Sequence, residues 1–207
     1  MLIAILIVVV LGFSIFLPGK KIKPAYIKDS ILDDWTENIE KRVSKTKYFG
    51  LEEKVTYVYQ KDGFTDYPAE LTITTYRSIL MINEEELKSR TIDMIKNLKK
   101  EEITVNEDSL VKGKRKLKNG HESFFLTYNG SKNNSGKKVK IIGEVWNCGV
   151  SHESVICLGI TYLPENYTAD MVNKYFQNWV KIVADEKGTI NKNYKNKDGL
   201  IYNVVCH

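Results

Sequence analysis

The sequence predicts an α+β fold: a mostly antiparallel sheet of six to seven strands, flanked by helices and preceded by an N-terminal transmembrane helix. Three observations predict it: consecutive hairpin signals, amphipathic helical stripes between groups of strands, and an uncharged apolar run at the start. The chain has 207 residues, of which 43% are hydrophobic, so it is long enough for one domain with its own core. The net charge of +5 is small and spread along the chain, which argues against nucleic-acid binding.

The apolar run comprises residues 2–17, contains no charge and is followed by Pro18-Gly19 and three lysines, Lys20, Lys21 and Lys23. A helix of this length spans about 24 Å, slightly less than a bilayer core of about 30 Å. Small residues suited to signal-peptide cleavage do not follow it. We therefore expect an uncleaved membrane anchor, with a cleaved signal peptide as the alternative. The predicted organisation is an anchor or signal-like segment at 1–19, a linker with an amphipathic helix at 20–47, and the sandwich domain at 48–207.

The side of the membrane on which the domain lies is indicated by conflicting signals. The lysines follow the run and none precedes it, which favours a cytoplasmic domain. Three glycosylation sequons, at Asn129, Asn133 and Asn166, and cysteines on facing hairpin arms favour an oxidising compartment. We expect a single-pass protein of the cell membrane with an extracytoplasmic domain.

The elements follow in order after the anchor. Leu32, Trp35, Ile39 and Val43 have helical spacing, which predicts an amphipathic helix over residues 26–45. Strand-like segments at 53–60 and 69–77 are joined across Asp62-Gly63. Asn83 and Glu86 have the spacing of a capping box, which opens a helix whose apolar stripe runs from Leu87 to Leu98.

Four further strands form two predicted hairpins. Segments 109–118 and 121–128 meet through Asn119-Gly120, a strong turn signal, and segments 137–148 and 155–163 meet through a short loop. Thr168 is expected to cap a last helix that buries Trp179, and residues 200–207 are expected to add a terminal strand. Trp146 and Trp179 are both expected to lie in the core.

The order of elements from about Tyr57 to His207 resembles that of the PsbP-like sandwich, in which helices flank an antiparallel sheet. The phrase Gly143-Glu-Val-Trp-Asn-Cys148, followed by Val155-Ile-Cys-Leu-Gly159, resembles a signature of uncharacterised, membrane-anchored archaeal proteins. The chain lacks the aromatic-Pro opening common in the PsbP-like group. The resemblance implies a binding or assembly factor rather than an enzyme, although a fold alone does not give a function.

No nucleophile elbow, phosphate-binding loop, dinucleotide fingerprint or zincin motif is present, so we predict no catalytic residue and no cofactor. His121, next to the Asn119-Gly120 turn, is interpreted as an exposed hairpin residue. A basic cluster lies on one predicted strand and comprises Lys112, Lys114, Arg115, Lys116 and Lys118. It is interpreted either as a solvated strand face or as a contact surface for anionic lipid or an acidic protein partner.

The cysteines form the most unusual pattern. Cys148 and Cys157 lie on facing arms of the second hairpin, where a simple register would allow a disulfide. The alternatives are ordinary buried thiols, or a zinc or copper site built from Cys148, His152, Cys157, Cys206 and His207. That site would require the C-terminal segment to return beside the hairpin.

The leading functional hypothesis is therefore a non-enzymatic, membrane-anchored, extracytoplasmic binding or assembly domain. The alternative is a thiol- or metal-dependent protein that uses the Cys148, His152, Cys157 and Cys206 group.

Overall fold

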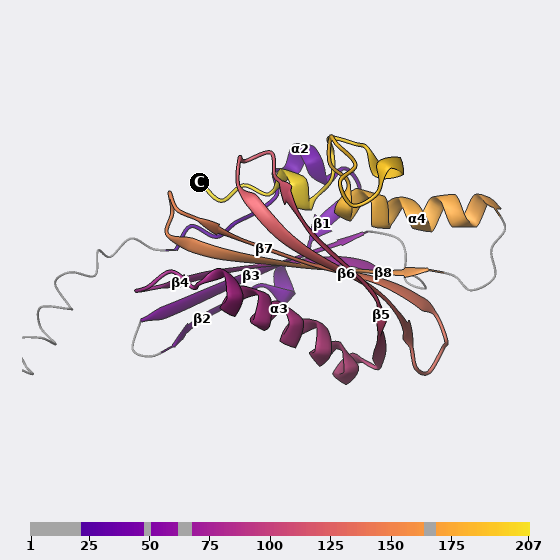
Figure 1. Cartoon of the computed structure of the whole chain (residues 1–207), viewed down its shortest axis with the longest axis horizontal. Helices are drawn as coiled ribbons and strands as arrows, with labels where there is room; N and C mark the ends of the chain where they lie inside the picture. Colours follow the sequence, from indigo (N-terminus) through magenta and orange to yellow (C-terminus); the bar gives the residue numbers. More distant parts are fainter. Residues whose placement is uncertain (1–21, 48–50, 62–67, 164–168) are drawn as a thin grey trace, which may run out of the picture.

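A computed structural model describes residues 22–47, 51–61, 68–163 and 169–207, with the side chains of the last range given from residue 175 onward. Its centre is an antiparallel eight-stranded sheet in the order β1-β3-β4-β8-β7-β6-β5, with β2 also paired to β3 (Figure 1). The strands are β1 (Trp35–Glu37), β2 (Val43–Lys47), β3 (Glu52–Lys61), β4 (Ala69–Ser78), β5 (Ile103–Lys116), β6 (Glu122–Lys132), β7 (Lys138–Cys148) and β8 (Glu153–Leu163).

Helices and short 3₁₀ turns cover both faces of this sheet. They are α2 (Asp29–Leu32), α3 (Glu84–Asn97), α4 (Ala169–Val183), η1 (Ile39–Lys41), η3 (Leu98–Glu101), η4 (Lys192–Tyr194) and η5 (Ile201–Asn203). Figure 1 shows α3 on one face and α4, α2 and the C-terminal segment on the other. The α+β class predicted from the sequence is confirmed.

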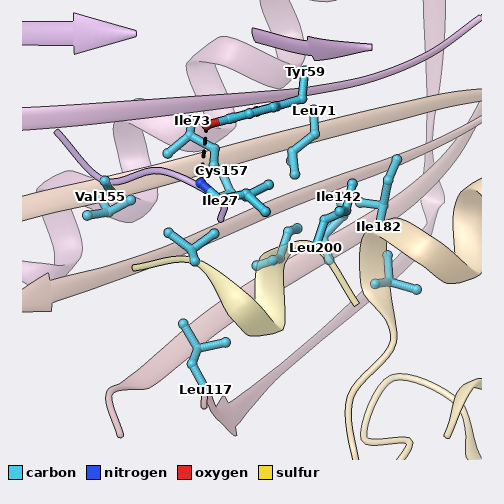
Figure 2. Close-up of a cluster of buried hydrophobic side chains, with 14 of the residues drawn as sticks. Ile27, Tyr59, Leu71, Ile73, Leu117, Ile142, Val155, Cys157, Ile182 and Leu200 are labelled. Carbon is cyan, nitrogen blue, oxygen red and sulfur yellow. Dashed lines mark hydrogen bonds between the residues drawn. The ribbon is translucent and has the colours of Figure 1, made fainter. Parts of the chain in front are cut away.

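The two faces carry separate parts of the core because neighbouring residues of a strand point to opposite sides. On β7, Ile142 belongs to the cluster beneath α4 and the C-terminal segment, and Ile141 to a cluster beneath α3. Both side chains are fully buried. Figure 2 shows the first cluster, in which Leu200 from the C-terminal segment lies among side chains of the sheet.

Glycines in the central strands allow the helices to approach closely. A Cβ atom added to Gly143 would lie 2.3 Å from Thr91 Cγ2 of α3, and one added to Gly159 would lie 2.7 Å from Ile182 Cγ2 of α4. Each helix therefore packs against a position where the sheet has no side chain.

Most predicted elements are confirmed. All six central strands and both long helices are present, and the Asn83 side chain caps α3 by accepting from the Glu86 N–H at 2.9 Å. Trp146 and Trp179 are both buried, as expected. Thr168, the predicted cap of α4, lies outside the described residues.

The predicted helix over 26–45 is wrong. The segment instead forms α2, β1, η1 and β2, and the two strands pair with β3. Asp33 has a φ of 52°, in the left-handed region, where α2 ends. The edge of β3 then offers backbone hydrogen bonds to the following residues, so Trp35 is buried as predicted whereas Ile39 is 70% exposed.

The predicted terminal strand at 200–207 is also not formed. Residues 201–203 make the 3₁₀ turn η5, and an isolated antiparallel bridge joins Val205 to Tyr26. The sheet exceeds the predicted six to seven strands because β1 and β2 come from the segment that was expected to be helical.

The predicted anchor at residues 1–19 lies outside the described residues. Within the described part of the chain, no helix combines the length and apolar character needed to cross a bilayer.

Candidate functional site

Two cysteines and two histidines converge at one end of the sheet: Cys148, Cys206, His121 and His207. Cys148 is the last residue of β7, and His121 lies between the Asn119-Gly120 turn and the start of β6. Cys206 and His207 follow η5 in the C-terminal segment. The C-terminal segment thus returns beside the second hairpin. This is the arrangement that the metal site expected from the sequence requires.

Backbone contacts hold this segment in place. The amides of Tyr26 and Val205 donate to each other's carbonyl oxygens at 3.0 and 2.8 Å. The Leu200 N–H donates to the Lys181 carbonyl of α4 at 2.7 Å, and the Asn119 side-chain amide donates to the Val204 carbonyl at 3.0 Å. The turn that carries His121 is therefore attached directly to the segment that carries Cys206.

The ligand atoms of the four residues all lie within 4.8 Å of one another. His207 Nδ1 is 3.4 Å from Cys148 Sγ and 3.5 Å from Cys206 Sγ. In a tetrahedral zinc site with Zn–S of about 2.3 Å and Zn–N of about 2.05 Å, a sulfur and a nitrogen ligand are about 3.5 Å apart. The two measured separations agree with this geometry.

The surroundings of the cluster are largely protected from solvent. Cys148 is fully buried and Cys206 is 3% exposed, while His121 is partly buried and His207 is exposed. Burial raises the pKa of Cys206 to about 12, and the neighbouring Cys148 thiol makes a smaller contribution in the same direction. Burial and the nearby His207 ring lower the pKa of His121. Without a cation, Cys206 therefore remains a neutral thiol at neutral pH. The lowered pKa of His121 favours its neutral imidazole, which is the form that binds metals.

One buried nitrogen atom at this site, His121 Nε2, has no hydrogen-bond partner among the described residues. Buried polar atoms are rarely left unpaired in folded proteins. The indole N–H of Trp146 lies near Cys206, whose pKa it lowers against the larger effect of burial. A metal ion would satisfy the imidazole nitrogen, and a metal-bound thiolate would give the indole N–H a stronger acceptor.

The structure places the residues of the predicted metal set in two groups. Cys148, Cys206 and His207 come together, whereas Cys157 and His152 lie outside the cluster. His152 is exposed in the β7–β8 loop with a φ of 56°. Cys157 is fully buried among apolar side chains, as Figure 2 shows, and burial raises the pKa of its thiol well above the ordinary value.

The predicted Cys148–Cys157 disulfide is not formed, and all three cysteines are free. The register of the hairpin is the reason, because Cys148 lies opposite Glu153 and Cys157 lies opposite Glu144. The two thiols belong to different rungs of the ladder, too far along the strands for a bond that requires Cα atoms within about 7 Å.

The interpretation of His121 as an exposed hairpin residue is wrong. β6 pairs with β7 so that Phe124 lies opposite Val145, which brings the start of β6 to the end of β7 where Cys148 lies. Nothing in the local sequence shows this pairing, since it depends on the register between two strands.

The basic cluster, which lies on β5 except for Lys118 just beyond its end, divides between exposed and buried positions. Lys112, Lys114, Lys116 and Lys118 are exposed. Arg115 is buried, so its inclusion in a surface-binding cluster is wrong. Its guanidinium donates to both carboxylate oxygens of Glu144, at 2.8 and 2.6 Å, and to Asp185 Oδ2 at 3.1 Å.

Two of the three sequons are described. Asn129 is exposed within β6, where its side chain accepts a hydrogen bond from Lys140 Nζ at 3.2 Å. Asn133 is exposed in the β6–β7 turn and accepts from the Thr104 hydroxyl. Asn166 lies outside the described residues.

Comparisons with known proteins identify no relative, since no protein family, curated protein or solved structure matches the chain.

Proposed function

We propose that this chain is a non-enzymatic metal-binding domain tethered to a membrane, in which Cys148, Cys206, His121 and His207 hold a Zn²⁺ ion. The observation that carries the proposal is the convergence of these four potential ligand atoms within 4.8 Å. Two thiolates and two imidazoles are a ligand set that zinc prefers, and four protein ligands are typical of structural rather than catalytic zinc.

The chemistry of binding follows from the burial of the thiols. Each cysteine would lose its proton to solvent as its sulfur bonds to the metal, and two thiolates would neutralise the charge of a divalent ion. Neutrality matters because Cys148 and Cys206 are nearly inaccessible to water. In such a buried environment an uncompensated charge is unfavourable. The Asn119 side-chain amide, 3.8 Å from Cys206 Sγ, and the Trp146 indole N–H would donate to the bound thiolate.

The metal would connect two separate parts of the chain. Cys148 and His121 belong to the sheet and its turn, whereas Cys206 and His207 belong to the C-terminal segment. Coordination would therefore hold that segment against the sheet, in the manner of structural zinc sites whose binding energy contributes to folding.

The remaining parts of the proposal rest on the sequence. The apolar run at 2–17 supports a membrane tether, the three sequons support a domain outside the cell, and the element order supports a PsbP-like sandwich that binds or assembles with a partner. The exposed lysines of β5 are the proposed contact for an acidic protein or anionic lipid headgroups.

Elemental analysis of the purified full chain tests the metal proposal. We expect one zinc per chain, and we expect the Cys148→Ser variant to lose most of it. Cys157→Ser is the matched control, because Cys157 is equally buried but lies outside the cluster. The control should retain zinc, with circular dichroism showing that both variants are folded.

Two results would contradict the proposal. Equal zinc content in the two variants would place any metal elsewhere in the protein. A wild-type chain that stays metal-free after refolding with zinc, with Cys148 and Cys206 open to alkylation, would mean that the cluster is not a metal site.

A further inference from the structure

One end of the sheet collects apolar side chains that protrude into solvent. Leu80 is 82% exposed and Val150 is 73% exposed, while Met81, Ile79 and Leu51 are 44%, 43% and 41% exposed. They lie in three connections, from β2 to β3, from β4 to α3 and from β7 to β8. We call these five residues the apolar rim.

Register and hydrogen bonds show that the three connections lie at the same end. Ser78 pairs with Glu52, Arg77 pairs with Glu153, and Glu153 also pairs with Cys148. The Ile79 N–H donates to the Leu51 carbonyl at 3.3 Å. The Asn147 side-chain amide donates to the Ile82 carbonyl at 2.9 Å, which joins the β4–α3 connection to the end of β7.

The described chain also begins at this end. The Lys23 N–H donates to Glu153 Oε1 at 2.8 Å, beside the β7–β8 loop that carries Val150. Farther along, the Ala25 N–H donates to Thr75 Oγ1 and the Ile27 N–H donates to the Tyr59 hydroxyl, so the chain runs from the rim across the sheet. Figure 1 shows the β7–β8 hairpin and the end of β4 on the left of the view, where the described chain starts.

The distance to the apolar run of the sequence is short. From Leu17 to Lys23 there are 23 − 17 = 6 residue steps. At no more than about 3.6 Å per residue, these steps span at most about 22 Å. If residues 2–17 lie in a bilayer, Lys23 and the adjacent rim are therefore held close to its surface.

Exposed lysines lie at the same end of the sheet as the apolar rim. Lys23, Lys45 and Lys47 are exposed, and Lys47 pairs with Glu52 at the start of β3, next to the rim residue Leu51. Lys20 and Lys21 precede them in the sequence. Apolar tips with lysines beside them can bind lipid surfaces, since the tips enter the headgroup boundary and the lysines attract anionic lipids. The exposed Glu84, Glu85 and Glu86 at the start of α3 oppose this attraction on the Met81 side of the rim.

We infer that the apolar rim lies on the bilayer to which the chain is tethered, so that the sheet stands with this end against the lipid. The inference rests on the tether in the proposed function and is independent of the metal. It also places Cys148, and with it the metal cluster, at the membrane-facing end of the domain.

Tryptophan quenching in reconstituted vesicles tests this orientation. The full chain is reconstituted into phosphatidylcholine vesicles, with and without phosphatidylglycerol, using brominated lipid as the quencher. The Leu80→Trp variant is compared with Ile39→Trp, because Ile39 is a similarly exposed apolar residue in η1, beside the middle of β3. The native Trp35, Trp146 and Trp179 are all buried and supply the background signal.

We expect severalfold stronger quenching for Leu80→Trp than for Ile39→Trp, and stronger quenching still when phosphatidylglycerol is present. Equal quenching at the two positions in a chain that floats with the vesicles would overturn the rim contact while leaving the tether intact. A chain that does not float with vesicles would overturn the tether and the rim contact together. Cross-linking of two rims to each other, with no quenching by lipid, would assign the rim to self-association instead.

Discussion

At the scale of single residues, Arg115 is a buried cation held by two carboxylates. Its side chain and that of Glu144 have no exposed surface, and Asp185 is 3% exposed. Burial raises the pKa of Asp185, but the Thr189 N–H and the Arg115 guanidinium together hold it below its ordinary value. The Ser123 hydroxyl also donates to Glu144 at 2.5 Å, so the buried charges are compensated by hydrogen bonds as well as by one another.

Replacing Arg115 by Met should lower the free energy of unfolding by about 3–5 kcal/mol, because two buried carboxylates would lose their cation. Lys116→Met is the control, since Lys116 is the exposed neighbour on the same strand and its change should stay within about 0.5 kcal/mol. Urea unfolding followed by circular dichroism measures both. A loss below about 1 kcal/mol for Arg115→Met would mean that the carboxylates protonate at little cost.

Strand alternation correctly places the three lysines of β5 on one face, but it does not show that Arg115 on the other face meets carboxylates from β7 and from beyond α4. The same limit applies to His121, whose partners are distant in the sequence. Local pattern gives the direction of a side chain, whereas its partner depends on register and on how the layers pack.

At the scale of elements, the C-terminal segment carries half of the proposed metal ligands. Its backbone at Gly199 packs so closely against its neighbours that there is no space for a side chain. A Cβ atom there would lie 1.9 Å from the carbonyl oxygen of Ala184 and 2.7 Å from its carbonyl carbon. These are backbone atoms just beyond α4, so they have little freedom to move.

Gly199→Ala should therefore displace the segment, reduce zinc affinity by at least about tenfold and lower stability by about 1–3 kcal/mol. Competition with a chromophoric chelator measures the affinity. Gly149→Ala is the control, because Gly149 adjoins the ligand Cys148 yet a Cβ there would meet nothing within 4 Å. Unchanged affinity in Gly199→Ala would show that the metal is held without this segment.

Elements with strong periodicity and a turn or cap signal were predictable, as α3 with its Asn83 cap shows. The segment 26–45 was not, because its helical spacing is outweighed by the unpaired edge of β3. The prediction of a strand over the C-terminal segment is wrong for a similar reason, because contacts with the rest of the protein outweigh the local pattern. Its apolar residues serve to cover the face of the sheet, and only Val205 makes a bridge.

At the scale of the whole molecule, the sequence predicted a helix-flanked antiparallel sheet because consecutive hairpins are local features. It did not give the order of the hairpins in the sheet. The pairing of β4 with β8 joins the N-terminal strands to the C-terminal ones, and no turn signal marks it. The metal cluster depends on the same level of organisation, since its ligands come from β7, the β5–β6 turn and the C-terminal segment.

The β4–β8 pairing also has a kinetic consequence. Arg77 pairs with Glu153, which is 153 − 77 = 76 residues away, and Ala69 pairs with Thr161, which is 161 − 69 = 92 residues away. Closing such a loop costs entropy before any contact is gained, so it should follow the β5–β6, β6–β7 and β7–β8 hairpins during refolding. Pulsed hydrogen exchange should find hairpin amides protected first and the amides shared by β4 and β8 last, over milliseconds to seconds. Simultaneous protection of both sets would instead mean that the two halves of the sheet form in one step.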